Sequence, residues 1–468
     1  MKTTFGVIVT SRGIFPGHLI EGAKKQLFSL LEKHDMDYVI LPADATPTGA
    51  VQTEADAIKC AELFHQNADK IKGIIVCLPN FGEEAPVFST IQRAKLDVPV
   101  LVQACDDEDD KLGLDDRRDA FCGKLSLCNN LYYAGIKFTD TTLHTCTLDS
   151  PEFEADLRRF EKVCSVVHKM RNARIGLIGM RPDGFRTVRV SEKILQRNGI
   201  TTIVTDLSEI LAEAKAMEDE AVIKEYMEKI HNYGSIPDSI SEEKIRLQAK
   251  LVATVKNWVE KNKCDAFCMQ CWESLEHNYG CAACLSMSMM GEEGIPGACE
   301  SDVMGAVTML ALNEAAGNKS AYMDWNNNFT KNRNVCINQH CGNFPKSFFG
   351  VPIEISNLDV LAKGMGSDIC FGACKGQVAP GEMTYAKVAT DDCRGVMKAY
   401  FGDGEFIADK IPSFGALSAW KVPNLQNLLH YLCANGFEHH VATVRGQCAD
   451  ILEEAFGKYL GWEVYHHE

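Results

Sequence analysis

Short apolar segments of strand length alternate with longer segments of helix length in the first part of the chain. Strands are expected at residues 5–10, 38–41, 74–78 and 98–102, and amphipathic segments such as residues 18–33 separate them. Strands that alternate with helices build a parallel sheet, because each crossover helix returns the chain to the same edge and covers one face of the sheet. The pattern therefore predicts an α/β domain with a Rossmann-like parallel sheet.

The same pattern restarts near residue 171. Residues 174–179 are expected to form a buried strand with a glycine-rich exit, a helical pattern follows near residues 190–197, and the next strand is expected at residues 201–204. Further on, residues 303–312 are almost wholly apolar, which predicts a buried helix. The pattern thus predicts a second α/β domain of the same class.

After residue 330 the sequence pattern changes from alternating strands and helices to β-prone segments that are separated by glycine and proline. Strands are expected at residues 351–355, 383–390, 396–401 and 405–407. We therefore predict a mixed α/β protein with three parts. These are an N-terminal α/β domain (residues 1–170), a second α/β domain that carries the acidic candidate residues (171–330), and a β-rich, barrel-like C-terminal domain that carries a late histidine (331–468).

The charge of the chain argues against several classes of partner. It has 48 Lys and Arg against 64 Asp and Glu, a net charge of −16, and no block of basic residues that could attract a phosphate backbone or an anionic lipid surface. No segment approaches the roughly 20 apolar residues that span a bilayer, and the first residues do not resemble a signal peptide. We therefore expect a cytoplasmic protein with a small-molecule partner, and neither nucleic acid nor a membrane as partner.

The 20 cysteines are scattered through apolar segments, which indicates reduced and mostly buried thiols rather than a disulfide framework. Two C-x-x-C pairs, Cys268 with Cys271 and Cys281 with Cys284, could supply four thiolates to zinc or to an iron–sulfur cluster. However, the gap between the pairs is shorter than in zinc ribbons, and the second pair resembles the start of a buried helix. We favour a metal-free structural role, with a thiolate-metal or redox protein as the alternative.

Two carboxylates and several imidazoles form a more dispersed set. Glu300 directly precedes the apolar helix, and Asp324 ends a strand-like run 24 residues later, so both could point into one crevice at the edge of the sheet. His340 and the pair His439 and His440 follow. Together they would make a mixed oxygen and nitrogen site that suits Mn²⁺, Co²⁺ or Mg²⁺. The alternative is that each residue is structural, in a helix start, a turn or a surface turn.

Three short motifs in this order resemble the L-fucose isomerase and L-arabinose isomerase family: Cys-Glu-Ser-Asp at residues 299–302, Tyr-Met-Asp at residues 322–324 and Asn-Gly-x-x-His-His at residues 435–440. The three-part plan of the chain is also similar to that of this family, so the resemblance covers essentially the whole chain. It implies a metal-dependent aldose–ketose isomerase that acts on an open-chain sugar. It also implies a homo-oligomer, either a hexamer or a trimer-based assembly.

The resemblance also assigns roles to individual residues. It implies that Glu300 and Asp324 are metal ligands and the proton-transfer pair, one acting at C2 and the other at a sugar oxygen. It implies that His439 is the late metal ligand, with its neighbour His440 as the alternative. His340 resembles an additional ligand of the arabinose branch.

Substrate recognition is expected to involve residues outside the metal set. We expect a substrate-binding role for Arg12, Trp272, Trp325 and His340, with a core role or surface salt bridges as the alternative. Three further arginines cluster after the strand that opens the second domain: Arg181, Arg186 and Arg189. If these face the pocket, the substrate is an anionic sugar such as a sulfosugar or phosphosugar. A sugar-binding or sensor protein without catalysis is the alternative from a different class.

Overall fold

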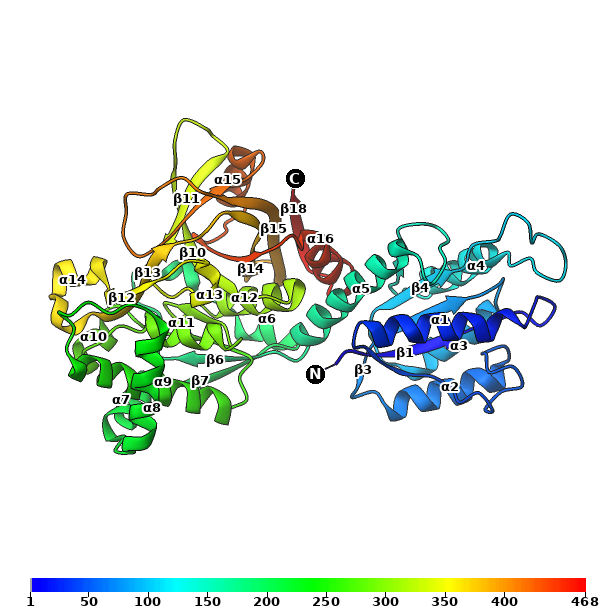
Figure 1. Cartoon of the computed structure of the whole chain (residues 1–468), viewed down its shortest axis with the longest axis horizontal. Helices are drawn as coiled ribbons and strands as arrows, with labels where there is room; N and C mark the ends of the chain where they lie inside the picture. Colours follow the sequence, from blue (N-terminus) through cyan, green and yellow to red (C-terminus); the bar gives the residue numbers. More distant parts are fainter. Residues whose placement is uncertain (1) are drawn as a thin grey trace. The chain divides into compact units, whose positions relative to one another are not determined.

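The computed structural model describes residues 2–468, and the chain forms two compact units that divide between His168 and Lys169 (Figure 1). Within the first unit, five parallel strands form one sheet in the order β2-β1-β3-β4-β5. The strands are β1 (Thr4–Val9), β2 (Asp37–Val39), β3 (Ile71–Leu78), β4 (Val100–Ala104) and β5 (Thr139–Asp140). The helices are α1 (Leu19–Lys33), α2 (Glu54–Gln66), α3 (Glu84–Ala94), α4 (Ala120–Tyr133) and α5 (Pro151–Met170), the last of which runs into the second unit.

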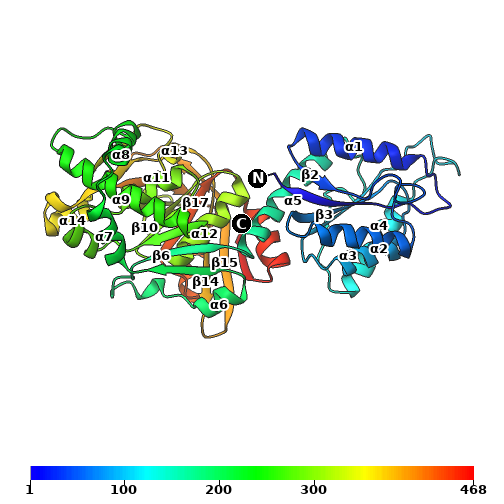
Figure 2. The ribbon, with the colours of Figure 1, turned by 90° about the horizontal axis from the view of Figure 1, so that it is seen from below.

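Successive residues of these strands face two different cores. Val7 and Ile75 pack with side chains of α1 and α5, whereas Ile8 and Ile74 pack with side chains of α2, α3 and α4. Figure 2 shows α1 on one face of the sheet and α2 and α3 on the other. Burial on both faces explains why the strands are continuous apolar runs rather than alternating ones. The first α/β domain predicted from the sequence is therefore confirmed.

The second unit opens with a parallel sheet in the order β7-β6-β8-β9. Its strands are β6 (Arg174–Ile178), β7 (Thr201–Thr205), β8 (Ala266–Met269) and β9 (Gly297–Cys299). The helices in this part are η1 (Arg186–Val188), α6 (Glu192–Arg197), α7 (Leu207–Ala216), α8 (Glu220–Tyr233), α9 (Glu242–Lys261), α10 (Ser274–Tyr279), α11 (Cys284–Glu292) and α12 (Val303–Ala316). This sheet is the second Rossmann-like element that the sequence predicted.

A closed β-barrel follows in the second unit. Six strands run in the order β16-β11-β10-β17-β14-β15, and pairing of β15 with β16 closes the ring. The strands are β10 (Ser320–Asn328), β11 (Val335–His340), β14 (Gly381–Asp391), β15 (Val396–Ile407), β16 (Ala416–Lys421) and β17 (His440–Arg445), with β12 (Glu354–Asn357), β13 (Phe371–Gln377) and β18 (Glu463–His467) added at the sides. The remaining helices are α13 (Lys346–Phe349), α14 (Asp359–Met365), η2 (Ser367–Ile369), α15 (Leu425–Ala434), α16 (Ala449–Leu452) and η3 (Glu453–Tyr459).

The barrel confirms the predicted β-rich C-terminal part, with two differences in detail. Its strand β10 begins at Ser320, ahead of the expected change of texture at residue 330. β15 is one continuous strand where the sequence predicted two, because the ladder with β14 runs unbroken through Gly402 and Gly404. A Cβ atom at Gly402 would meet the hydroxyl of Tyr385, so this glycine serves close packing rather than a turn.

Helix α12 joins the two sheets of the second unit. It packs on β8 and β9 of the parallel sheet and on β10, β14 and β17 of the barrel. Most of its residues are buried, as its apolar sequence predicted. Although α12 is strongly apolar, no helix within residues 2–468 is both long and apolar enough to cross a membrane.

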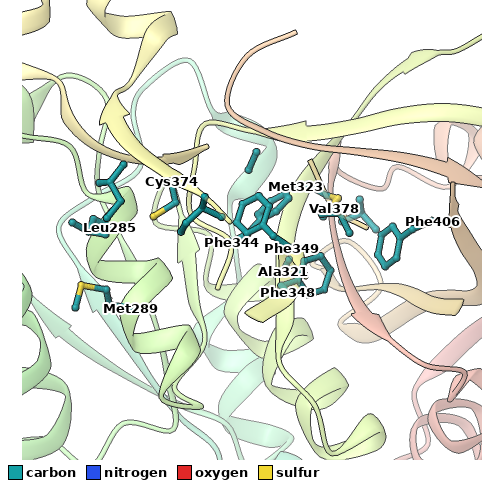
Figure 3. Close-up of a cluster of buried hydrophobic side chains, with 14 of the residues drawn as sticks. Leu285, Met289, Ala321, Met323, Phe344, Phe348, Phe349, Cys374, Val378 and Phe406 are labelled. Atoms are coloured by element: carbon teal, nitrogen blue, oxygen red, sulfur yellow. The ribbon is translucent and has the colours of Figure 1, made fainter. Parts of the chain in front are cut away.

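The core of the second unit extends from the barrel to α11 (Figure 3). Phe348 lies between Phe344 and Phe406, with ring centres 5.8 and 5.6 Å apart. Ala321 and Met323 of β10 face this core. Because side chains alternate along a strand, Tyr322 and Asp324 project from the opposite face of β10, toward α12.

Candidate metal and proton-transfer site

Glu300 lies in an unusual turn between β9 and α12. Both Glu300 and Ser301 have left-handed backbone conformations, with φ of 59° and 56°. Such conformations cost non-glycine residues on the order of 1–3 kcal/mol each and collect at functional sites. Asp302 then begins α12, because its Oδ1 accepts a hydrogen bond from the backbone N–H of Gly305 at 2.8 Å. The turn leaves the Glu300 side chain only 4% exposed.

Asp324 and His440 approach Glu300 from the barrel. The two residues are direct partners in the antiparallel pairing of β10 with β17, so their side chains are neighbours on one face. His440 Nε2 lies 2.8 Å from Oε2 of Glu300 and 3.5 Å from Oδ1 of Asp324. We call Glu300, Asp324 and His440 the carboxylate–histidine cluster.

Two further histidines border this cluster. His340 ends β11 and is buried, with its ring centre 6.0 Å from that of His440. The side chain of His439 is 42% exposed, and its Nε2 lies 3.7 Å from Oδ1 of Asp324. Donor atoms of Glu300, His340 and His440 lie within 4.8 Å of one another, as do those of Asp324, His439 and His440. His440 is common to both groups.

Four polar atoms here are buried without a hydrogen bond to any residue within 2–468: Glu300 Oε2, Asp324 Oδ1, His440 Nε2 and His340 Nδ1. Glu300 Oε2 and His440 Nε2 lie 2.8 Å apart as an ion pair but do not form a hydrogen bond. Each unsatisfied buried polar atom costs about 1–3 kcal/mol, so four together indicate a missing partner. Carboxylate oxygens and imidazole nitrogens suit Mn²⁺ and similar ions. The residues present therefore fit the divalent ion expected from the sequence.

Asp302 holds the His440 ring through Nδ1, the ring nitrogen that does not face Glu300 and Asp324. Its Oδ2 lies 3.0 Å from His440 Nδ1 and 2.7 Å from Lys387 Nζ, and it also accepts a hydrogen bond from the Tyr322 hydroxyl. Burial opposes ionisation of Asp302, but Lys387 and His440 outweigh it and hold the pKa of this carboxyl well below its usual range. A carboxylate on one ring nitrogen orients the other nitrogen toward a ligand. His440 Nε2 is thereby directed at Glu300 and Asp324.

The balance between burial and neighbouring charged groups also sets the charge of the carboxylate–histidine cluster. Burial works against a charged Glu300, but the neighbouring His440, His340 and His439 hold its pKa below the usual value. Burial also lowers the pKa of His440, and contacts with Asp302 and Glu300 overcome this and raise it to about 9. Glu300 is therefore a carboxylate at neutral pH.

The predicted aromatic residues lie in different surroundings. The Trp272 ring meets Phe185 edge to face at 5.5 Å, and Phe185 lies 6.2 Å from the His439 ring. Trp325 instead packs on Trp420 at 5.1 Å, on the face of β10 opposite Asp324. Its edge also lines a cavity of about 360 Å³ together with His439. Trp272 thus lies near the exposed His439 side of the carboxylate–histidine cluster, and Trp325 belongs mainly to the barrel core.

The predicted arginines are divided between the two units. Arg12 lies in the first unit, where its guanidinium binds Oε2 of Glu84 at 2.6 Å and the carbonyl of Gly82 at 3.0 Å. Its role in substrate binding stays a prediction. Arg181 lies in the second unit, in the loop that carries Phe185, and donates to loop carbonyls at 3.1 and 3.4 Å. The contact of Phe185 with the His439 ring brings this loop close to the carboxylate–histidine cluster.

The four C-x-x-C cysteines do not form a common site. All four are buried, as predicted. Among residues 2–468, Cys271 belongs to a group of potential metal ligands, but with Cys299 and Glu300; Cys268, Cys281 and Cys284 belong to none. The alternative of a four-thiolate site is therefore not supported by the geometry.

Family comparison relates two segments of the chain to known enzymes. Residues 6–171 match the N-terminal domain of fucose/sulfoquinovose isomerase, and residues 338–467 match the C-terminal domain of L-fucose isomerase. The chain belongs to the fucose/sulfoquinovose isomerase family. Glu300 and Asp324 lie between the two matched segments, and His440 lies in the second.

Curated relatives of this family member are sulfoquinovose isomerases. Those of Priestia aryabhattai and Priestia megaterium are each 27% identical over 321 residues, which cover 68% of this chain and 69% of the relatives. The enzyme of Alkalicoccus urumqiensis is 24% identical over 299 residues, covering 63% and 64%. Among solved structures, a solute-binding protein of an ABC transporter from Burkholderia multivorans is 9% identical, covers 68% of this chain and 95% of its own, and has a TM-score of 0.19, which is too low to support a comparison.

The site also contains residues that the sequence did not single out. Lys387 lies on β14, far from the motifs, and no local pattern marks it. Asp302 stands in the Cys-Glu-Ser-Asp motif, and its position before an apolar helix is typical of an N-cap. That position predicts the cap but not the contact with His440.

Proposed function

We propose that this chain is a metal-dependent aldose–ketose isomerase that acts on an open-chain sulfosugar. The approach of Glu300 and Asp324 to one nitrogen of His440 carries this proposal. Glu300 follows β9 of the parallel sheet, whereas Asp324 and His440 lie in the barrel. The family supports isomerisation, and the relatives named sulfoquinovose isomerase support a sulfonated substrate. A neutral sugar of the fucose or arabinose type is the less favoured substrate.

Glu300, Asp324 and His440 would hold the divalent ion, with Mn²⁺, Co²⁺ and Mg²⁺ as candidates. When bound, such an ion supplies an electrophile that stabilises negative charge on the two adjacent sugar oxygens. His440 is favoured over His439 as the nitrogen ligand because His440 is fully buried and is oriented by Asp302. His439 is more exposed and can contact the substrate from the rim.

Isomerisation also requires a base and an acid on the chain. Glu300 and Asp324 both lie within 3.5 Å of His440 Nε2, so both can reach neighbouring atoms of one substrate. One carboxylate takes the proton from C2, and the other exchanges a proton with the sugar oxygen. The buried surroundings of Glu300 exclude water from the proton in transit.

The sulfonate would be bound by the arginine-containing loop after β6. Phe185 places this loop beside Trp272 and His439. Arg181 in the same loop is half-buried and holds its guanidinium against loop carbonyls. A guanidinium can donate two parallel hydrogen bonds to oxygens of one anionic group.

The test uses the purified chain with Mn²⁺ in D₂O and a panel of neutral, phosphorylated and sulfonated aldoses. NMR should detect a ketose that carries solvent deuterium, formed fastest from a sulfonated aldose. Glu300→Gln and Asp324→Asn should each lower the rate about 10²–10⁴-fold. The matched control is Glu293→Gln, an exposed residue paired with Lys256, which should keep the rate.

Three outcomes would contradict the proposal. Near-normal activity of Glu300→Gln or Asp324→Asn would remove the mechanism. Faster conversion of a neutral aldose would remove the sulfosugar assignment. No ketose from any sugar, in a sample shown to contain Mn²⁺, would favour a sugar-binding or sensor protein.

A further inference from the structure

Two cysteine thiols lie in contact next to the carboxylate–histidine cluster. Cys271 Sγ is 3.2 Å from Cys299 Sγ. Cys271 follows β8 and Cys299 ends β9, and these strands pair in parallel with Met269 opposite Cys299. Because the carboxyl ends of parallel strands share one edge of the sheet, both thiols reach the same place. Both side chains are buried.

Glu300 completes a group of three donors with these thiols, which we call the thiol cluster (Cys271, Cys299 and Glu300). One carboxylate oxygen and the two sulfurs all lie within 4.8 Å of one another. Ligands at about 2.0–2.3 Å from a zinc ion leave similar separations between donor atoms, so this spacing admits a single ion.

The thiol cluster differs in chemistry from the carboxylate–histidine cluster. Two sulfurs and one oxygen form a soft donor set, which selects zinc or cadmium over manganese or magnesium. The second set, of two carboxylates and an imidazole, suits the harder ions. Glu300 is the one residue shared by the two clusters as defined here, and its Oε2 has no hydrogen bond to any residue within 2–468.

We propose that Cys271, Cys299 and Glu300 form a second cation site that takes a thiophilic divalent ion such as Zn²⁺, and that an ion bound there inhibits the isomerase by engaging Glu300. On binding, each thiol releases its proton to solvent, and each sulfur donates an electron pair to the ion. The Glu300 carboxylate then binds the ion and is no longer free to accept a substrate proton. The inhibitory part rests on the proposed function, whereas the binding part does not.

Cadmium is a suitable probe for the binding part. The full chain, reduced and freed of metal with a chelator, is titrated with Cd²⁺ while the ultraviolet thiolate-to-cadmium absorption and the bound cadmium are measured. We expect one thiolate-bound Cd²⁺ per chain, bound at least about 10-fold more weakly in Cys271→Ser and in Cys299→Ser. Cys268→Ser is the matched control, because this thiol is equally buried on β8 but lies outside the cluster.

An equal absorption change in the unmodified chain and in Cys271→Ser would overturn the binding part. A second measurement covers the case in which the serine variants do not fold. Cadmium NMR of the unmodified chain should give a shift in the range of mixed sulfur and oxygen ligands. A shift typical of oxygen and nitrogen ligands alone would also overturn the site.

The inhibitory part is tested with Zn²⁺ added at fixed Mn²⁺, with each rate expressed relative to the uninhibited rate of the same variant. Cys271→Ser should need at least about 10-fold more Zn²⁺ for half-inhibition. Equal sensitivity would place inhibition elsewhere and overturn this part. Cysteine-dependent Cd²⁺ binding in a chain that isomerises no sugar would support the site and refute the proposed function, whereas an active isomerase without such binding would refute the site alone.

Discussion

His440 Nδ1 lies 3.0 Å from Oδ2 of Asp302, and both side chains are fully excluded from solvent. The same carboxylate oxygen pairs with the buried Lys387 at 2.7 Å. Asp302 therefore links the orientation of a candidate metal ligand to the neutralisation of a buried lysine. The two roles are separated by combining a replacement of Asp302 with a replacement of Lys387.

Asp302→Asn should weaken Mn²⁺ binding about 10–100-fold, because His440 loses the carboxylate that orients it. The same change should destabilise the fold by about 3–5 kcal/mol, since Lys387 is left as an unpaired buried charge. Calorimetric titration with Mn²⁺ and urea unfolding measure the two effects. The double variant Asp302→Asn with Lys387→Met should regain stability without regaining affinity; recovery of both would contradict the orienting role.

Replacing the two adjacent histidines one at a time should have unequal effects on metal binding. His440→Gln should lower Mn²⁺ affinity by at least about 10²-fold, whereas His439→Gln should lower it by less than about 10-fold. The difference follows from the burial of His440 and from the exposure of His439 at the rim. Metal content after dialysis at a set free Mn²⁺ concentration is the measurement. The reverse order would support His439 as the ligand implied by the family resemblance.

Arg181→Ala should raise KM for the sulfosugar about 10–100-fold, because a charge-assisted hydrogen bond contributes about 1.5–3 kcal/mol. KM for a neutral aldose should change little. Arg189→Ala is a suitable control, since this exposed side chain lies in the same loop and donates to the carbonyl of Arg186. Parallel increases for charged and neutral sugars would show that Arg181 shapes the loop instead of binding the sulfonate.

Glu276 should make stability depend on pH. Its side chain is fully buried on α10, and neither carboxylate oxygen has a hydrogen bond to the residues within 2–468. Burial raises the pKa of Glu276 to about 7. The folded state thus keeps this proton at pH values where the unfolded state has released it, so stability falls as pH rises from near the ordinary glutamate pKa of about 4.3 to about 7.

Glu276→Gln should remove this loss and stabilise the protein by about 4 kcal/mol above pH 7 relative to the unmodified chain, with little difference at pH 4. Urea unfolding across this pH range is the measurement. The exposed Glu213 on α7 provides the control, because Glu213→Gln should change stability by less than about 0.5 kcal/mol at every pH. A pH-independent difference for Glu276→Gln would contradict the raised pKa.

Ser301→Gly should stabilise the protein by about 1 kcal/mol, because glycine adopts the left-handed conformation of residue 301 without strain from a Cβ atom. The serine hydroxyl is also buried without a hydrogen bond among the described residues, so its removal costs little. Chemical unfolding gives the change. In Ser208→Gly, on the ordinary helix α7, the sign should be opposite; destabilisation of both variants would show that the turn is not strained.

The periodicity of the sequence was sufficient to predict the two parallel sheets and the buried helix α12. It was also sufficient to place Glu300 just ahead of this helix, because the apolar run marks where the helix begins. The expectation that Asp324 ends a strand was wrong, since β10 continues to Asn328 and Asp324 lies in its middle. Local sequence patterns could not decide whether His439 or His440 is the candidate metal ligand. The choice depends on which residue of β17 stands opposite Asp324, and that pairing joins strands more than a hundred residues apart. Lys387 was missed for the same reason, since only the folded barrel brings β14 to Asp302.

The pairing of Asp324 with His440 limits how this part of the chain can change in length. Side chains alternate with a period of two, so the loss of one residue from β10 ahead of Asp324 would turn its carboxylate into the apolar barrel interior. The loss of two residues would return the Asp324 carboxylate to its original face of the sheet, but would shift it along the strand. Insertions and deletions among related chains should therefore collect in the loops at the strand ends, while β10 and β17 keep a constant number of residues.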